Sequence, residues 1–292
     1  MRSFEAILAR CREGLSLPEA VLALEEEERG IPAAEVRERM RRRLEDLEAS
    51  VRGVEEHPAR GRLVGGEAER MEAYLREGSP LSGPFTARAS ALALKVATGN
   101  AAMRRIVAAP TAGSCGILPG VLVAYRRTFA SSEEELLAAL VVAGAVGSVV
   151  AERATLAGAE GGCQAECGAA AAMAASALAV LRGGSPEDGV HAAALVLQSV
   201  LGLVCDPVAG LVEVPCVLRN GSLVGLAVLG ADLALSGIRS LIPPDEVVDA
   251  LGSVGRALPA SLRETSRGGL AVTPTGAALA RRLASEAPRL EG

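Results

Sequence analysis

Three loops of this 292-residue chain combine reactive side chains with glycine and proline. The first loop contains Cys115, the second contains Cys163, and the third begins at Cys205 and runs on to Cys216. They read APTAGSCGILPG (109–120), AEGGCQAECG (159–168) and CDPVAGLVEVPC (205–216). Glycine lets backbone N–H groups approach a ligand closely, as anion and cluster sites require. We therefore expect the chemistry of this protein to lie in these loops.

The spacing of the cysteines narrows the choice of metal centre. Between Cys163 and Cys205 lie 41 residues, and between Cys205 and Cys216 lie 10. The sequence contains no pair of CxxC motifs, which disfavours a ribbon-type zinc site. Thiolates suit zinc or iron–sulfur centres, and a four-iron cluster on three thiolates would keep one iron open as a Lewis acid. On spacing alone, the alternative that these cysteines are buried and unreactive stays equally open.

The loop sequences resemble those of a known family. The strings IVAAPTAGSCGILPG, AEGGCQAE and LGLVCDPVAGLVEVPC are similar to the signature loops of iron–sulfur-dependent L-serine dehydratases, in particular the alpha chain of the two-chain form. This resemblance spans most of the chain after residue 80. It implies an all-helical catalytic domain that deaminates L-serine to pyruvate and ammonia. It also implies a [4Fe-4S] cluster on Cys163, Cys205 and Cys216, and a separate beta chain in a hetero-oligomer.

Two departures from the family pattern concern cysteines. Some single-chain relatives place a C-terminal cysteine on the open iron, but no cysteine follows Cys216 here. Conversely, Cys167 stands where an apolar residue is expected, four residues after Cys163. A helical turn would bring Cys167 to the same cluster, close the site and favour an electron-transfer subunit. The alternative is that Cys167 is a bystander at the start of a helix.

Several polar residues near the loops are candidates for substrate binding. Thr111, Gly113 and Ser114 could hydrogen-bond a substrate carboxylate, although turn formation alone would also explain them. Asn100 precedes the same loop and is a weaker candidate. Arg219 follows Cys216 closely, and its guanidinium could donate two hydrogen bonds to a substrate carboxylate. The alternative is that Arg219 is an ordinary surface arginine.

Other catalytic classes find little support in the sequence. A cysteine nucleophile such as Cys115 usually needs a histidine base, and His57 and His191 are the only histidines. A pyridoxal-phosphate enzyme needs a lysine, and Lys95 is the only one, within a predicted amphipathic helix. The general base of a dehydratase is left unassigned, and we expect it to come from the beta chain. The role of Cys115 stays open: it could be an inert thiol, a thiol that lines the site or a nucleophile.

Helices must position these loops. From residue 87 onward the chain is rich in Ala, Leu, Val and Gly, which favours helix over strand and predicts an all-α bundle of closely packed, small-residue helices. Residues 1–80 hold 32 of the 65 charged residues and predict a helical arm and connector. Within it, a helix is predicted from Pro32 to about Glu56. The arm either packs on the main body, residues 81–292, or contacts another chain.

Composition excludes further classes. A net charge of −5 and an aromatic content of 2% argue against a nucleic-acid binder, which needs basic and stacking surfaces. The uncharged stretches are each shorter than the ~18–20 residues that span a bilayer, so no membrane segment is predicted. The first residues lack the apolar core of a signal peptide. We therefore expect a cytoplasmic protein whose cysteines are reduced.

Overall fold

The computed structural model describes residues 2–286, and this part of the chain contains helices and no strands. The helices are α1 (Phe4–Arg12), α2 (Leu17–Arg29), α3 (Ala33–Glu56), α4 (Glu67–Glu77), α5 (Gly83–Ala101), α6 (Ile117–Phe129), α7 (Glu133–Arg153), α8 (Gly158–Gly161), α9 (Ala169–Leu181), α10 (Pro186–Ser199), α11 (Cys216–Leu235), α12 (Pro244–Ala257) and α13 (Pro274–Glu286). The predicted all-α class is confirmed.

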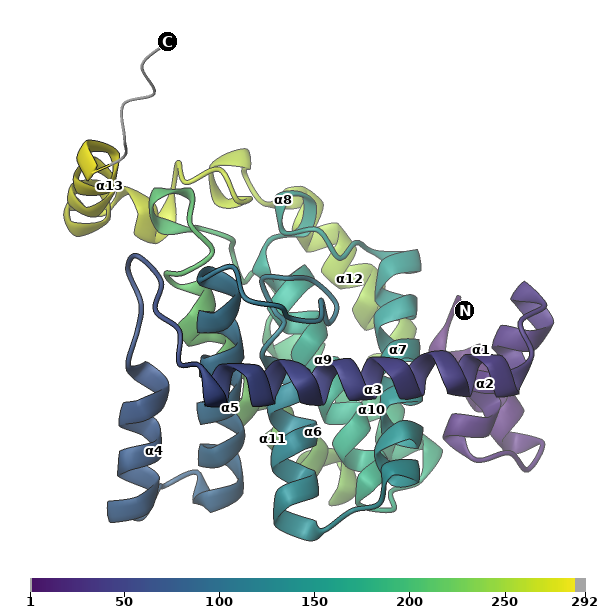
Figure 1. The fold of residues 1–292 in the computed structure, drawn as a ribbon. Coiled ribbons are helices and arrows are strands. Elements are labelled where there is room, and N and C mark those ends of the chain that lie inside the picture. The colour runs from purple at the N-terminus through teal and green to yellow at the C-terminus, as the bar shows by residue number, and fades with distance from the viewer. Residues whose placement is uncertain (1, 287–292) are drawn as a thin grey trace.

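Helix α9 forms the centre of the bundle, with α6, α7, α10 and α11 packed around it (Figure 1). Nearly all of its residues are buried, and most of them are alanine. Small side chains allow helix axes to approach closely, so the bundle is dense although it contains few large residues. Gly120 of α6 shows how tight the packing is. A Cβ atom there would lie 2.8 Å from the Ala89 carbonyl oxygen and 2.9 Å from the Ala93 amide nitrogen, both in α5.

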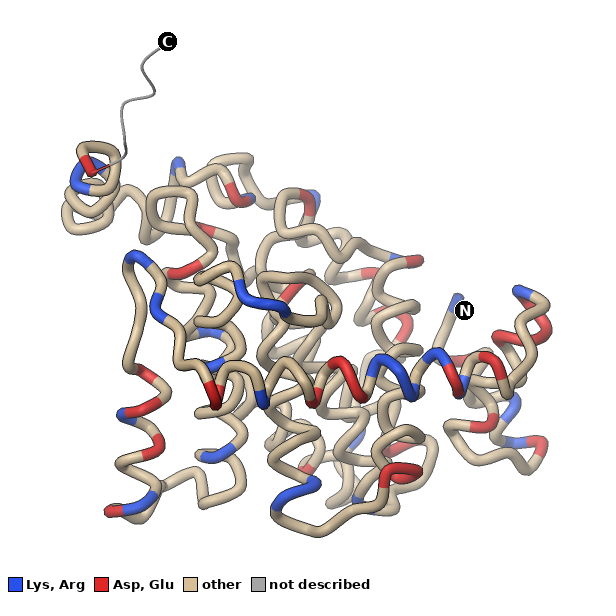
Figure 2. The backbone as a smooth tube through the Cα atoms, viewed as in Figure 1, with Lys and Arg blue, Asp and Glu red and all other residues tan. Residues whose placement is uncertain are grey.

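The N-terminal helices are rich in charged residues, and α3 runs across one face of the bundle (Figures 1 and 2). The predicted helix from Pro32 to Glu56 is confirmed. Its inner face buries five residues: Leu44, Leu47, Ser50, Val51 and Val54. On its outer side, Arg41 pairs with Glu133 at 3.0 Å and with Glu134 at 2.8 Å, both in the first turn of α7. The arm therefore packs on the body, and the domain boundary at residue 80 stays a prediction.

Three helical segments are long and apolar enough to cross a membrane by length and composition: α7, residues 164–181 and α11. The expectation that no segment reaches this length is wrong, because the helices continue past the uncharged stretches into charged or polar residues. In this structure 67%, 83% and 44% of their apolar windows, respectively, are buried inside the molecule. The first two segments thus direct most of their apolar surface toward the protein core.

The cysteine loops lie together at one end of the bundle. The segments before α6, α9 and α11 meet at the upper end in Figure 1. The chain after α12 returns across this end: the Cys205 amide donates to the Leu262 carbonyl at 2.9 Å, and the Glu264 amide donates to the Cys205 carbonyl at 2.8 Å. A segment some 60 residues downstream therefore holds the Cys205 loop in place.

Candidate functional site

The three predicted cluster cysteines occupy the starts of elements. Cys163 directly precedes a π-helical turn, Gln164–Gly168, that leads into α9. Cys205 lies in the loop that the Leu262–Glu264 segment holds, and Cys216 is the first residue of α11. All three are buried. A π-helical turn inside a helix is frequent at functional sites, because it redirects side chains that an α-helix would place elsewhere.

The cysteine sulfurs are close enough to influence one another's ionisation. Burial raises the pKa of Cys216 to about 12, and the neighbouring Cys163 adds to this shift. The pKa of Cys205 is also raised, first by burial and then by Cys163. In contrast, the pKa of Cys163 is lowered, because interaction with the Cys167 thiol and attraction to the Arg219 guanidinium outweigh burial. The three predicted ligands therefore form one electrostatically connected group.

A cavity of about 190 Å³ opens beside these thiols. Its walls come from three stretches of chain that are far apart in the sequence, together with Glu264. The lining residues are Ala112, Gly113, Glu166, Cys205, Pro207, Gly210, Val212, Cys216 and Glu264. The structure thus brings two predicted cluster ligands and one predicted substrate-binding residue, Gly113, to the same cavity.

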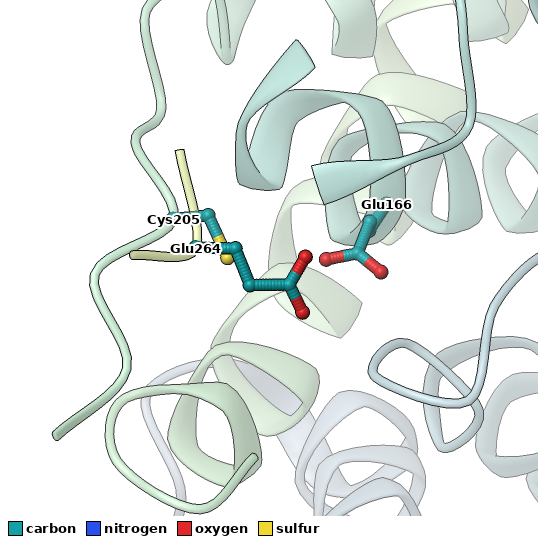
Figure 3. A group of neighbouring side chains, drawn as sticks. All are labelled: Glu166, Cys205 and Glu264. Atoms are coloured by element: carbon teal, nitrogen blue, oxygen red, sulfur yellow. The ribbon is translucent and has the colours of Figure 1, made fainter. Parts of the chain in front are cut away.

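Two carboxylates face each other at this cavity, as Figure 3 shows for Glu166 and Glu264. The ligand atoms of Glu166, Cys205 and Glu264 all lie within 4.8 Å of one another. Burial raises the pKa of Glu166, although interaction with the Thr111 hydroxyl partly offsets it. Thiol and carboxylate donors gathered in this way could hold a metal ion or a metal cluster. Nothing in the sequence around Glu264 indicates this role, because only the return of the chain after α12 brings it here.

The loop before α6 is braced internally and by α11. The Ser114 hydroxyl lies 3.1 Å from the Thr111 hydroxyl and accepts a hydrogen bond from the Thr111 amide at 3.3 Å. Asn220 of α11 donates to the Gly113 carbonyl at 2.8 Å and accepts from the Gly116 amide at 2.9 Å. This single buried amide therefore fixes both sides of the loop. Its signal in the sequence is weak: a lone asparagine within an apolar helix.

Arg219 joins two of the loops. Its guanidinium donates to the Val204 carbonyl at 2.7 Å and to the Asp206 carboxylate at 2.8 Å, and its charge attracts Cys163. In the Arg219–Asp206 pair the Asp206 side chain is buried, with 4% exposed, and the Arg219 side chain is largely buried, with 15% exposed. These contacts use two guanidinium nitrogens of Arg219, the group that was predicted to bind a substrate carboxylate. That substrate role stays a prediction, and the structure adds a positioning role.

The remaining sequence candidates lie in varied places. Asn100 is near the C-terminal end of α5 and is not among the cavity-lining residues. Burial raises the pKa of Cys115 to about 12, which makes this thiol a poor nucleophile. The His191 ring accepts a hydrogen bond from the Ser240 amide at 3.1 Å, and His57 follows the end of α3. Neither histidine lines the cavity.

Cys167 lies beside the site, because the π-helical turn that follows Cys163 places it there. Its sulfur lies 3.8 Å from the Gly113 carbonyl oxygen and can donate to it, and its pKa is raised well above the ordinary value through interaction with Cys163 and burial. A protonated Cys167 therefore bridges the first and second loops. This geometry favours a neutral thiol at Cys167, next to the three predicted ligands.

Comparison with known proteins identifies the family. The family model described as the serine dehydratase alpha chain matches residues 12–271. The "Probable L-serine dehydratase, alpha chain" of Bacillus subtilis is 47% identical over 247 residues, which cover 84% of this chain and 82% of that protein. The "L-serine dehydratase, alpha chain" of Peptoniphilus asaccharolyticus is 48% identical over 215 residues, or 74% of each chain. "L-serine dehydratase 1" of Escherichia coli is 43% identical over 182 residues, which cover 62% of this chain and 40% of that protein. With matches of this extent, the chain belongs to the serine dehydratase alpha chain family.

Proposed function

We propose that this chain is the alpha subunit of an enzyme that converts L-serine to pyruvate and ammonia. The observation that carries the proposal is the cavity that Cys205, Cys216 and Gly113 line together, with Cys163 next to it. Family membership supports the same activity, since the alpha chain relatives are named for it. The reaction is an elimination of water across the α- and β-carbons of serine, followed by hydrolysis of the resulting imine.

The residues present fit an iron–sulfur cluster. Three buried cysteines supply the soft donors that iron–sulfur clusters prefer. A Cβ atom at Gly158 would lie 2.4 Å from Glu166 Oε2 and 3.4 Å from the Cys205 sulfur, so glycine at this position lets the Glu166 carboxylate lie beside the Cys205 thiol. We propose that Cys163, Cys205 and Cys216 hold a [4Fe-4S] cluster. When bound, the cluster would supply a Lewis acid for the serine hydroxyl at an iron without a cysteine ligand.

The chain's own residues would bind and orient the substrate. Thr111 and Ser114 are not among the cavity-lining residues, but they share a loop with Gly113, which is, and the proposal that their hydroxyls bind the serine carboxylate rests on this shared loop. Asn220 keeps this loop rigid, so the donors are positioned before the substrate arrives. Arg219 holds the Cys205 loop against Cys163. No histidine lines the cavity among residues 2–286, and we propose that the base for the α-proton comes from a beta chain.

The proposed assembly and location follow from the same family. The alpha chain names of the relatives support a separate beta chain, and hence a hetero-oligomer. We also propose a cytoplasmic location without a membrane or nucleic acid as partner. The six cysteines are free in the described chain, which suits a reducing compartment.

The decisive test of the cofactor is iron and sulfide analysis with electron paramagnetic resonance on anaerobically purified protein. We expect four irons per chain, and mild oxidation should release one iron and give a three-iron signal that added ferrous iron reverses. Cys216→Ser should lower the iron content, whereas the control Cys11→Ser should not, since Cys11 belongs to none of the three loops. A cluster that survives oxidation intact would favour electron transfer with Cys167 as fourth ligand. Zinc, or no metal after anaerobic reconstitution, would contradict the proposal.

A further inference from the structure

A second polar cavity, of about 450 Å³, lies between α3, α4, α5 and α6. Cavities of roughly 300–1,000 Å³ are typical of small-molecule sites. Its lining shares no residue with the cavity beside the cysteines. The lining residues are Glu55, Glu72, Leu75, Arg76, Arg88, Ala91, Leu92 and Arg127. Five of these eight residues are charged, which is unusual in a chain whose other helices are packed mainly through alanine and leucine.

Both acidic residues of this cavity are already neutralised by neighbours. The two oxygens of the Glu55 carboxylate accept hydrogen bonds from Arg127, at 2.7 and 2.8 Å. The Glu72 carboxylate lies 2.7 Å from the Lys95 ammonium group, whose side chain is only 14% exposed. These two ion pairs cancel the charges of four residues and leave no free carboxylate on the cavity wall.

Two guanidinium groups remain without a counter-charge. Arg88 donates one hydrogen bond, at 3.0 Å, to the uncharged Thr128 hydroxyl. Arg76 forms no ion pair or side-chain hydrogen bond with any residue in the described part of the chain. Arg76 comes from the last turn of α4 and Arg88 from the second turn of α5, and both line the cavity. The charged lining residues together with Lys95, which pairs with Glu72 from outside the lining, therefore have a net charge of two positive units.

We propose that this cavity binds a phosphate dianion, either free or as the monoester of a small organic molecule, between Arg76 and Arg88. The planar fork of a guanidinium matches two oxygens of a phosphate, and a dianion neutralises two such groups at once. A single carboxylate would neutralise only one of them. The apolar wall of Leu75, Ala91 and Leu92 offers room for the organic part of an ester.

Isothermal titration calorimetry on the full chain at pH 8 tests this site, with ionic strength held constant by sodium chloride. The probes are inorganic phosphate and glycerol 3-phosphate. Arg76→Gln and Arg88→Gln should each weaken binding about tenfold or more, since each removes a charge-assisted hydrogen bond. The control is Arg70→Gln, which changes the charge of α4 equally but lies outside the cavity and pairs with Glu67. It should bind both probes as the wild type does.

The two probes separate the possible sources of the phosphate group. Tighter binding of glycerol 3-phosphate would assign the site to an ester, and equal binding would assign it to the phosphate group alone; both support the proposal. No binding of either probe to the wild type would overturn it, as would equal binding by all three variants. Circular dichroism spectra of the variants establish that they are folded before the titrations are compared.

Discussion

At the scale of single residues, the site is held by a few buried polar contacts. Arg219 links Val204, Asp206 and Cys163, and Asp206 also accepts a hydrogen bond from the Leu270 amide at 2.8 Å. Asn220 performs the same task for the loop of Gly113. Such groups are costly to remove individually, because each leaves its former partner buried and unpaired.

The Arg219–Asp206 pair gives a first prediction. Asp206→Ala should lower the free energy of unfolding by about 3–5 kcal/mol, because it leaves the Arg219 charge buried without its partner. The control is Asp46→Ala, whose partner Arg105 is 81% exposed. That change should cost no more than about 1 kcal/mol, as for other surface ion pairs. Urea unfolding followed by circular dichroism measures both, and equal losses would contradict a buried, structural role for Asp206.

A second prediction concerns the substrate loop. Ser114→Ala should raise KM for L-serine about tenfold with kcat less affected, because the hydroxyl is proposed to bind the carboxylate in the ground state as well as in the transition state. Steady-state kinetics on the cluster-loaded complex with the beta chain provides the measurement. Asn100→Ala, the weaker candidate, serves as the comparison, because Asn100 lies near the end of α5 and not in the loop of Gly113. An unchanged KM in Ser114→Ala would assign this hydroxyl to turn formation alone.

At the scale of elements, close helix packing positions the loops. Gly116 and Gly120 both face α5, and their nearest neighbours there are backbone atoms of Ala89 and Ala93. Backbone atoms cannot move aside as a side chain can, so the start of α6 has a fixed distance from α5. The small-residue composition predicted this kind of bundle correctly. It could not predict which glycines form the contacts, since that depends on helix rotation.

The packing gives a third prediction. Gly120→Ala should destabilise the protein by about 1–3 kcal/mol, since its new methyl group would collide with the α5 backbone. Gly225→Ala in α11 is the matched control, because its Cβ atom would meet only Thr86 Cγ2 at 4.0 Å. That change should stabilise the protein by up to about 1 kcal/mol through helix propensity. Thermal unfolding of the two variants decides the matter, and a stable Gly120→Ala protein would disprove the tight contact.

At the scale of the whole molecule, the end of the bundle that holds the cysteine loops has no histidine at its cavity among residues 2–286. The reactive groups of the cavity lining are the thiols of Cys205 and Cys216 and the carboxylates of Glu166 and Glu264. The charged arm lies along another face, where α3 packs against α7 (Figure 2). The proposed beta chain would therefore have to approach the open cavity at the cysteine loops to deliver a base.

This arrangement gives a fourth prediction. The isolated, cluster-loaded chain should deaminate L-serine at least about a hundredfold more slowly than the complex with a beta chain, the usual scale of general base catalysis. Pyruvate formation, followed with and without added beta chain, is the measurement. Iron content must be equal in the two samples, so that the comparison reports the partner and not the cofactor. Full activity of the chain alone would show that the base is one of its own residues.

The sequence by itself determined the helical class, the helix from Pro32 to Glu56 and the family, because local propensity, periodicity and loop motifs are written in neighbouring residues. It also indicated Cys163, Cys205 and Cys216 as one group through the resemblance of their loops. Only the tertiary structure placed Glu264 beside Cys205 and Asn220 beside Gly113. These contacts join segments from about 60 to more than 100 residues apart. They arise from how the helices pack, which no local pattern encodes.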